Sequence, residues 1–124
     1  MAEILLVDDD PQVLKVFSAY LEKACHTIST AANGMEAIQL LERRKFDLVI
    51  TDILMPERDG FELMFFMRKR SDRPKIIAIS GGSPSLGHDY VLGVAKTIAA
   101  DMVLQKPVDF EALTKAVREV LQEH

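Results

Sequence analysis

Short apolar runs alternate along this chain with longer segments in which apolar residues recur every three or four positions. The short runs contain no turn residue, which is typical of strands buried on both faces of a parallel sheet. Residues 48–51, Leu-Val-Ile-Thr, are the clearest example. Runs at 3–7, 76–79 and 102–105 predict three more strands, and the more polar run at 27–31 suits the edge of a sheet.

The longer segments begin with residues that favour helix starts. Asp10 before Pro11 is typical of an N-cap followed by proline at the first helical position. Asn33-Gly34 turns the chain into a second segment, and Asp109 opens the last one. The predicted helices cover residues 11–24, 35–44, 61–70, 89–99 and 109–122. The residues expected to face the core are Val13, Leu14, Phe17, Tyr20, Leu21, Ala37, Ile38, Leu41, Phe110, Leu113, Val117, Val120 and Leu121.

Five strands alternating with five helices predict an α/β fold, a doubly wound parallel sheet with right-handed crossovers and helices on both faces. The chain of 124 residues is long enough for one hydrophobic core and too short for two ordinary domains, so we expect a single domain over residues 1–124.

Polar side chains follow four of the predicted strands. Asp8 and Asp9 follow the first, Asp52 the central one, and Ser80 and Lys106 the last two. Because the carboxyl ends of parallel strands meet at one edge, we expect these groups to converge. Clustered carboxylates repel and either take up protons or recruit a divalent metal, and Mg²⁺ keeps waters for phosphate oxygens. A lysine charge and a serine hydroxyl suit phosphate oxygens, so the pattern indicates a site for magnesium and a phosphoryl group.

Asp52 is the centre of this pattern. Residues 55–56, Met-Pro, block its strand from continuing into a helix, and residues 59–60, Asp-Gly, turn the chain. A lone aspartate after a strand is more often a turn or capping residue, and Asp10 is assigned such a capping role. The polar groups at the other strand ends favour a site for Asp52.

These residues resemble the receiver domain of bacterial two-component response regulators, the group that includes the chemotaxis response regulator. The resemblance extends from Ile4 to about Leu121. The matching pieces are Leu6-Val7-Asp8-Asp9-Asp10, the phosphoacceptor motif Asp52-Ile53-Leu54-Met55-Pro56 with Asp59-Gly60, Ser80 and Lys106-Pro107. The resemblance implies a flavodoxin-like five-stranded sheet with strand order 2-1-3-4-5, and a cis Lys106-Pro107 peptide bond.

The resemblance further implies a phosphorylation-dependent signalling domain whose only chemistry is its own phosphorylation and dephosphorylation. Asp52 is the expected acceptor of a phosphoryl group from a phosphohistidine on a sensor histidine kinase or phosphotransfer protein. Ser80 and Lys106 are expected to move toward the new phosphoryl oxygens. The implied Mg²⁺ ligands are Asp8, Asp9, Asp52 and the backbone carbonyl of Leu54.

The output surface implied by the resemblance comprises the predicted helix at 89–99, the strand at 102–105 and the helix at 109–122. It is expected to bind a downstream protein or output domain, and a phosphorylation-dependent homodimer is left open. The last predicted helix ends near the end of the chain, so we expect no output domain in this chain. The sequence leaves open a stand-alone receiver or a domain of a longer regulator.

The sequence departs from the common family pattern around this output surface. Val103 stands where the family often has a tyrosine or phenylalanine that turns inward on activation, and Tyr90 could replace it. Ala99 and Val108 replace a frequent glycine and phenylalanine. The segment between the serine and the lysine is also longer than usual, and we expect residues 80–87 to be mobile. We therefore hypothesise that residues 80–90 rearrange on phosphorylation.

Two rival functions fit the sequence less well. A degenerate receiver acting as a constitutive protein-binding module is disfavoured because every expected site residue is present. An aspartate-nucleophile phosphatase of the haloacid dehalogenase type requires a second aspartate two residues after the first, and this position is Leu54.

Charge and apolar patterning argue against nucleic-acid and membrane partners. The net charge is −4, and the densest basic run, residues 68–73, is interpreted as a solvated helix end, so we expect no direct nucleic-acid binding. No apolar run is long enough to insert into a membrane, and no signal peptide is apparent, which predicts a cytoplasmic location.

Cys25 is expected to be a half-buried apolar residue. His26, His88 and His124 lack metal-binding spacing.

Overall fold

The computed structural model describes residues 2–52, 59–80 and 100–122. Within these residues one five-stranded parallel sheet has the strand order β2-β1-β3-β4-β5, which confirms the predicted fold class and order. The strands are β1 (Glu3–Val7), β2 (Thr27–Ala31), β3 (Leu48–Asp52), β4 (Lys75–Ser80) and β5 (Met102–Gln105). The helices are α1 (Pro11–Lys23), α2 (Gly34–Arg43), α3 (Asp59–Arg68) and α5 (Phe110–Leu121). The helix predicted at 89–99 and the segment 81–87 lie outside the described residues.

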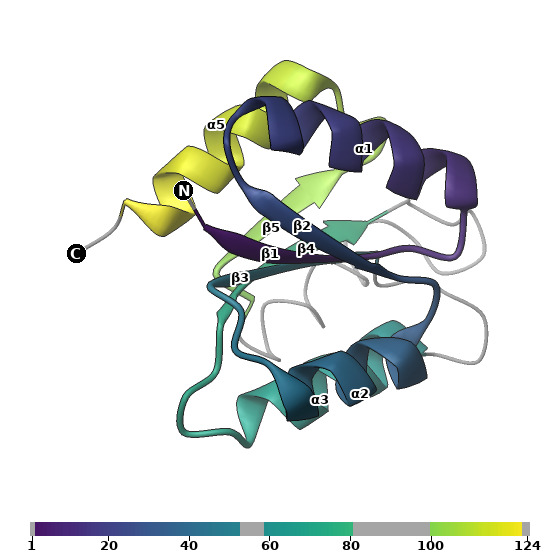
Figure 1. The fold of residues 1–124 in the computed structure, drawn as a ribbon, viewed down its shortest axis with the longest axis vertical. Helices are drawn as coiled ribbons and strands as arrows, with labels where there is room; N and C mark the ends of the chain where they lie inside the picture. Colours follow the sequence, from purple (N-terminus) through teal and green to yellow (C-terminus); the bar gives the residue numbers. More distant parts are fainter. Residues whose placement is uncertain (1, 53–58, 81–99, 123–124) are drawn as a thin grey trace.

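The sheet is the middle layer of three. Helices α1 and α5 cover one face, and α2 and α3 cover the other (Figure 1). Parallel strands must be linked by crossovers that run back along the sheet, so each helix begins near the carboxyl edge and ends near the amino edge. Functional groups at strand ends and helix starts are therefore gathered on one edge.

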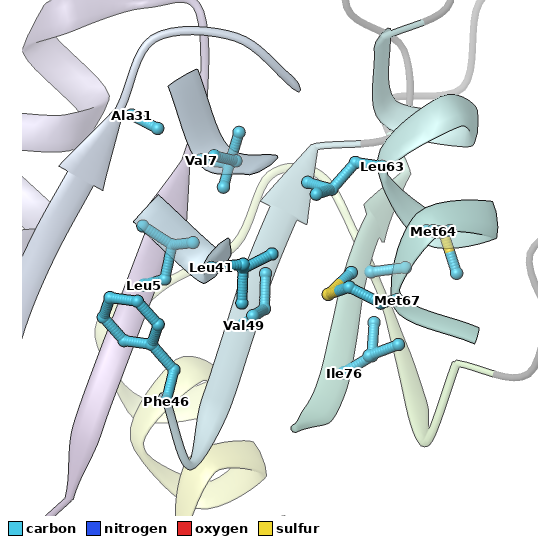
Figure 2. Close-up of a cluster of buried hydrophobic side chains, with 12 residues drawn as sticks. Leu5, Val7, Ala31, Leu41, Phe46, Val49, Leu63, Met64, Met67 and Ile76 are labelled. Atoms are coloured by element: carbon cyan, nitrogen blue, oxygen red, sulfur yellow. The ribbon is translucent and has the colours of Figure 1, made fainter. Parts of the chain in front are cut away.

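Two apolar clusters lie on opposite faces of the sheet. Leu5 and Val49 belong to the cluster beneath α2 and α3, where Leu41 and Met67 close it (Figure 2). The alternate strand residues join the second cluster beneath α1 and α5: Ile4, Leu6, Leu48, Ile50, Ile77 and Ile79. Because helices cover both faces of the sheet, the strands are continuously apolar. Every residue of β3 is buried.

The predicted helix caps are present. The Asp10 carboxylate accepts the Gln12 N–H at 2.9 Å, with Pro11 at the first helical position. The Asn33 side chain caps α2. The helix ends in the structure differ slightly from the predicted ones. Helix α2 begins one residue earlier than expected, and α3 begins and ends two residues earlier. None of the helices in the described ranges is long and apolar enough for a bilayer crossing.

The N-cap of α5 provides a stability test. Asp109 Oδ1 accepts the Ala112 N–H at 2.7 Å. We expect Asp109→Ala to lower the free energy of unfolding by about 1 kcal/mol because one helix-start N–H loses its acceptor. Urea denaturation measures the change. Asp109→Ser should retain most of the stability, and an equal loss in both variants would show that the cap is not the cause.

Two residues lie differently from the sequence expectation. Phe110, predicted to face the core, is 39% exposed because it is the first residue of α5 and lies at the outer seam with α1. Its ring stacks on Tyr20 with centroids 4.2 Å apart and meets Phe17 edge-on at 6.0 Å. Cys25, predicted to be half-buried, is exposed. It has φ 71° directly after the C-cap Ala24, where the chain reverses from α1 into β2.

Candidate functional site

The register of the two central strands places two carboxylates side by side. Val7 of β1 pairs with Thr51 of β3, so the next residues, Asp8 and Asp52, emerge together at the carboxyl edge. Both are buried, at 3% and 2% exposure. Burial of acidic side chains is costly unless nearby charges or hydrogen bonds compensate. Two buried carboxylates side by side therefore mark this position as a candidate functional site.

Asp9 joins this pair from the loop before α1. One carboxylate oxygen from each of Asp8, Asp9 and Asp52 lies within 4.8 Å of the others. Asp8 and Asp52 are buried, whereas Asp9 is exposed and gives the cluster an open side. Three hard, anionic oxygen donors with one open side fit Mg²⁺, which prefers a few carboxylates and retains several waters.

Asp8 is held in place by its backbone neighbours. The Asp10 N–H donates to Asp8 Oδ1 at 2.8 Å, and the Asp8 N–H donates to the Ala31 carbonyl at 3.1 Å. Burial raises the pKa of Asp8, and the negative charges of Asp52 and Asp9 add to that rise. The Asp10 hydrogen bond and the Lys106 charge oppose the rise only partly. The carboxylate cluster is therefore short of positive charge.

Among the described residues, Lys106 is the one cationic side chain seen beside this carboxylate cluster. Its Nζ lies 2.7 Å from Asp52 Oδ2. Partial burial lowers the pKa of Lys106, but the hydrogen bond to Asp52 and the charges of the three aspartates outweigh that effect and raise the pKa above its ordinary value. Lys106 thus stays charged beside Asp52. The Lys106-Pro107 peptide bond is cis, as expected.

The remaining predicted site groups are placed only in part. Ser80 ends β4 beside Gln105 of β5, so its backbone reaches the same edge, while its side chain lies outside the described residues. The Leu54 carbonyl and Tyr90 also lie outside them. Val103, in the position of the usual aromatic, pairs with Ala78 and packs against the cluster beneath α2 and α3.

One group at the site was not anticipated from the sequence. The buried Thr51 hydroxyl donates to the Asp52 backbone carbonyl at 3.1 Å. This contact ties down the peptide group that follows Asp52. A threonine in a β-branched run gives no sequence signal beyond strand propensity, so only the structure could show it.

Comparison with known proteins decides the family. The family model described as "Response regulator receiver domain" matches residues 4–118. The chain belongs to the response regulator receiver domain family. It is therefore a phosphorylation-dependent signalling domain of two-component systems.

Curated relatives of this receiver domain differ in length. It is 36% identical to Protein PilH of Pseudomonas aeruginosa, with 98% of each chain covered. It is 37% identical to the transcriptional regulatory protein GlrR of Escherichia coli over 98% of this chain but only 27% of GlrR. The domain thus spans nearly the whole of one relative and about a quarter of the other.

Solved receiver structures have the same fold. The chemotaxis response regulator CheY4 of Vibrio cholerae is 31% identical, with a TM-score of 0.86 over 98% of this chain and 99% of that one. The response regulator TrrA of Thermotoga maritima, solved in complex with Mg(2+)-BeF, is 31% identical with a TM-score of 0.82, over 98% and 100% of the two chains.

Proposed function

We propose that Asp52 is the phosphoacceptor of this receiver domain. The observation that carries the proposal is the buried Asp52 carboxylate, which lies within 4.8 Å of its two aspartate neighbours and 2.7 Å from Lys106 Nζ. This arrangement supplies a nucleophilic oxygen, a cation for a phosphoryl oxygen and a set of donors for a metal. We propose the donors Asp8, Asp9, Asp52 and the Leu54 carbonyl for Mg²⁺, which when bound would neutralise charge on the phosphoryl group.

The proposed reaction is a direct displacement. A carboxylate oxygen of Asp52 attacks phosphorus, and the bond from phosphorus to the imidazole nitrogen of a phosphohistidine breaks. The imidazole keeps the electron pair and takes up a proton. Lys106 then exchanges its contact with the free carboxylate for one with a phosphoryl oxygen, with the Ser80 hydroxyl as a second donor. Water later hydrolyses the acyl phosphate, so the domain turns over no substrate other than its own phosphoryl group.

The proposed partners follow from this reaction. The donor is a sensor histidine kinase or phosphotransfer protein, and cytoplasmic residence accompanies such a donor. We place the output on residues 89–99, β5 and α5, which a downstream protein or output domain would read, with residues 1–124 treated as one domain. Because Val103 lacks an aromatic ring, we retain the rearrangement of residues 80–90 as the proposed switch.

The experiment that tests the proposal is intact-mass measurement after incubation with acetyl phosphate, with and without magnesium. We expect a gain of one phosphoryl mass only when magnesium is present, and loss of that mass under alkaline conditions, where acyl phosphates hydrolyse. No gain with magnesium would contradict phosphoacceptor function and favour a constitutive binding module. Steady turnover of a generic phosphate ester would instead support a phosphatase.

A further inference from the structure

Basic side chains gather at the amino edge of the sheet, away from the phosphoacceptor site. Of the 15 lysines and arginines in the chain, eight lie at the end of α2, at the end of α3, in the connections to β3 and β4, or at the first residue of β4. We call these eight residues the basic edge: Arg43, Arg44, Lys45, Arg68, Lys69, Arg70, Arg73 and Lys75. The whole chain carries a net charge of −4, so this concentration runs against the overall balance.

Tertiary packing brings together two halves of the basic edge that are 25 residues apart in sequence. Helices α2 and α3 lie side by side on one face of the sheet (Figure 1). Leu41 of α2 and Met67 of α3 belong to the same buried cluster (Figure 2). Each is followed three residues later by an arginine, Arg44 or Arg70. The two basic runs therefore leave the core at the same edge.

Two arginines of the basic edge are pre-oriented by neighbours. Arg44 Nη2 lies 2.8 Å from Glu3 Oε1, and its guanidinium lies 5.2 Å from the centre of the Phe46 ring. The Arg70 guanidinium lies 5.5 Å from the centre of the Phe66 ring. Arg44 Nη1 also donates to Ser29 Oγ at 3.2 Å, so this guanidinium is largely engaged within the domain, and stacking on an aromatic ring further restricts both arginines.

The carboxylates nearby are largely engaged already. Asp47 Oδ2 accepts the Glu3 N–H at 2.8 Å, and Asp101 Oδ2 accepts the Ile76 N–H at 2.7 Å. Asp72 lies 3.5 Å from Arg70 Nε. In the described part of the chain, five exposed members of the basic edge form no ion pair: Arg43, Lys45, Lys69, Arg73 and Lys75.

Helix-dipole compensation accounts for only part of this charge. Cations stabilise the last turn of a helix, and Arg43 and Arg68 occupy those positions. The effect fades beyond the terminal turn, yet Lys45, Arg73 and Lys75 lie past the helix ends. Their placement calls for another explanation, and an external anionic partner provides one.

An exposed aromatic ring adjoins the basic edge. Phe65 of α3 is 49% exposed and precedes Lys69 by one helical turn. The exposed carboxylates Glu42, Asp47, Asp72 and Asp101 interrupt the basic surface. A continuous phosphate backbone would meet these carboxylates, whereas spaced acidic side chains can avoid them. The pattern therefore fits a polypeptide better than a nucleic acid.

We propose that the basic edge and Phe65 together bind an acidic segment of a partner protein that carries an apolar side chain for Phe65. The acidic side chains pair with the exposed lysines and arginines, and the apolar side chain covers the ring. Because the phosphoacceptor site occupies the carboxyl edge, this partner can be bound while Asp52 faces a phosphodonor. The proposal goes beyond phosphoryl acceptance and does not depend on it.

The test uses a fluorescent acidic peptide of alternating Asp and Glu with one central Leu, measured by anisotropy against the intact domain. A matched peptide with Asn and Gln in place of the acids is the charge control. We expect the double variant Lys69→Glu/Arg73→Glu to weaken acidic-peptide binding by about tenfold or more, because each reversal replaces attraction by repulsion. Lys115→Glu, an exposed charge reversal on α5, should leave binding within about twofold.

Additional binding measurements distinguish an acidic polypeptide from other classes of partner. Phe65→Ala should weaken binding of the Leu peptide but not of a peptide with Ser at the central position, and binding should weaken as salt is raised. Equal binding by the double variant and the wild type would overturn the proposal. Tighter binding of oligo-dT or of phosphatidylserine vesicles than of the acidic peptide would also overturn it. Phosphoryl uptake from acetyl phosphate should be unchanged in the double variant, which separates this test from that of the phosphoacceptor.

Discussion

An Asp52→Asn protein is expected to take up no phosphoryl group from acetyl phosphate, with or without magnesium. The amide keeps the shape of the carboxylate and can still accept a hydrogen bond from Lys106, so the fold of the site is retained. It lacks the anionic oxygen that attacks phosphorus, and a neutral amide is not a competent nucleophile in its place. Intact-mass measurement over the time course that saturates the wild type checks the prediction.

A matched control keeps this result interpretable. Asp72→Asn removes a carboxylate from the exposed α3–β4 connection, remote from the cluster, and should be phosphorylated like the wild type. A phosphoryl mass gained by Asp52→Asn at the wild-type rate would place the acceptor elsewhere and overturn the assignment. Circular dichroism of both variants establishes that the fold is intact.

Magnesium is expected to stabilise the folded domain, and Asp8→Asn is expected to remove most of that effect. Three carboxylates within 4.8 Å of one another bind a divalent cation only when the chain is folded. At a magnesium concentration one hundred times the dissociation constant, the free energy of unfolding should rise by about 2.7 kcal/mol. Without Asp8, a buried ligand of the cluster is lost, and the gain should fall below about 1 kcal/mol.

The same variant should behave oppositely without the metal. Asp8→Asn removes one of two buried neighbouring charges, so we expect it to be more stable than the wild type in a chelator. Asp10→Asn is the matched control, because asparagine also caps helices well and Asp10 lies outside the cluster. Urea denaturation with magnesium or chelator measures all three proteins. Equal magnesium stabilisation in the wild type and Asp8→Asn would contradict a metal site at Asp8.

The two predictions describe one electrostatic arrangement. The wild-type cluster is held by Lys106 alone among the cations seen around it in the described residues. Asp52→Asn should therefore lose phosphorylation because the nucleophile is missing, whereas Asp8→Asn should lose most of the metal's effect on stability and, with it, magnesium-dependent phosphorylation.

Within the described residues, the local sequence was sufficient to predict the helices and strands and the aspartates and lysine that lie at one edge of the sheet. Continuous apolar runs such as residues 48–51 are typical of strands covered on both faces, and caps such as Asp10 act within one turn, so both can be recognised without the fold. Parallel strands share a carboxyl edge, and for that reason Asp8, Asp52 and Lys106 could be expected to converge. The structure confirms this convergence, while metal binding and phosphorylation at these residues remain proposals.

Tertiary structure decided the features that depend on packing between distant elements. Phe110 has the spacing of a core residue, yet the seam between α1 and α5 leaves it 39% exposed. The exposure of Cys25 follows from the direction in which the chain leaves α1 for β2. The basic edge exists only because α2 and α3 end side by side, since the sequence alone shows two separate basic runs. Local interactions select helices, strands and caps, but exposure and charge clustering depend on which elements are neighbours in space.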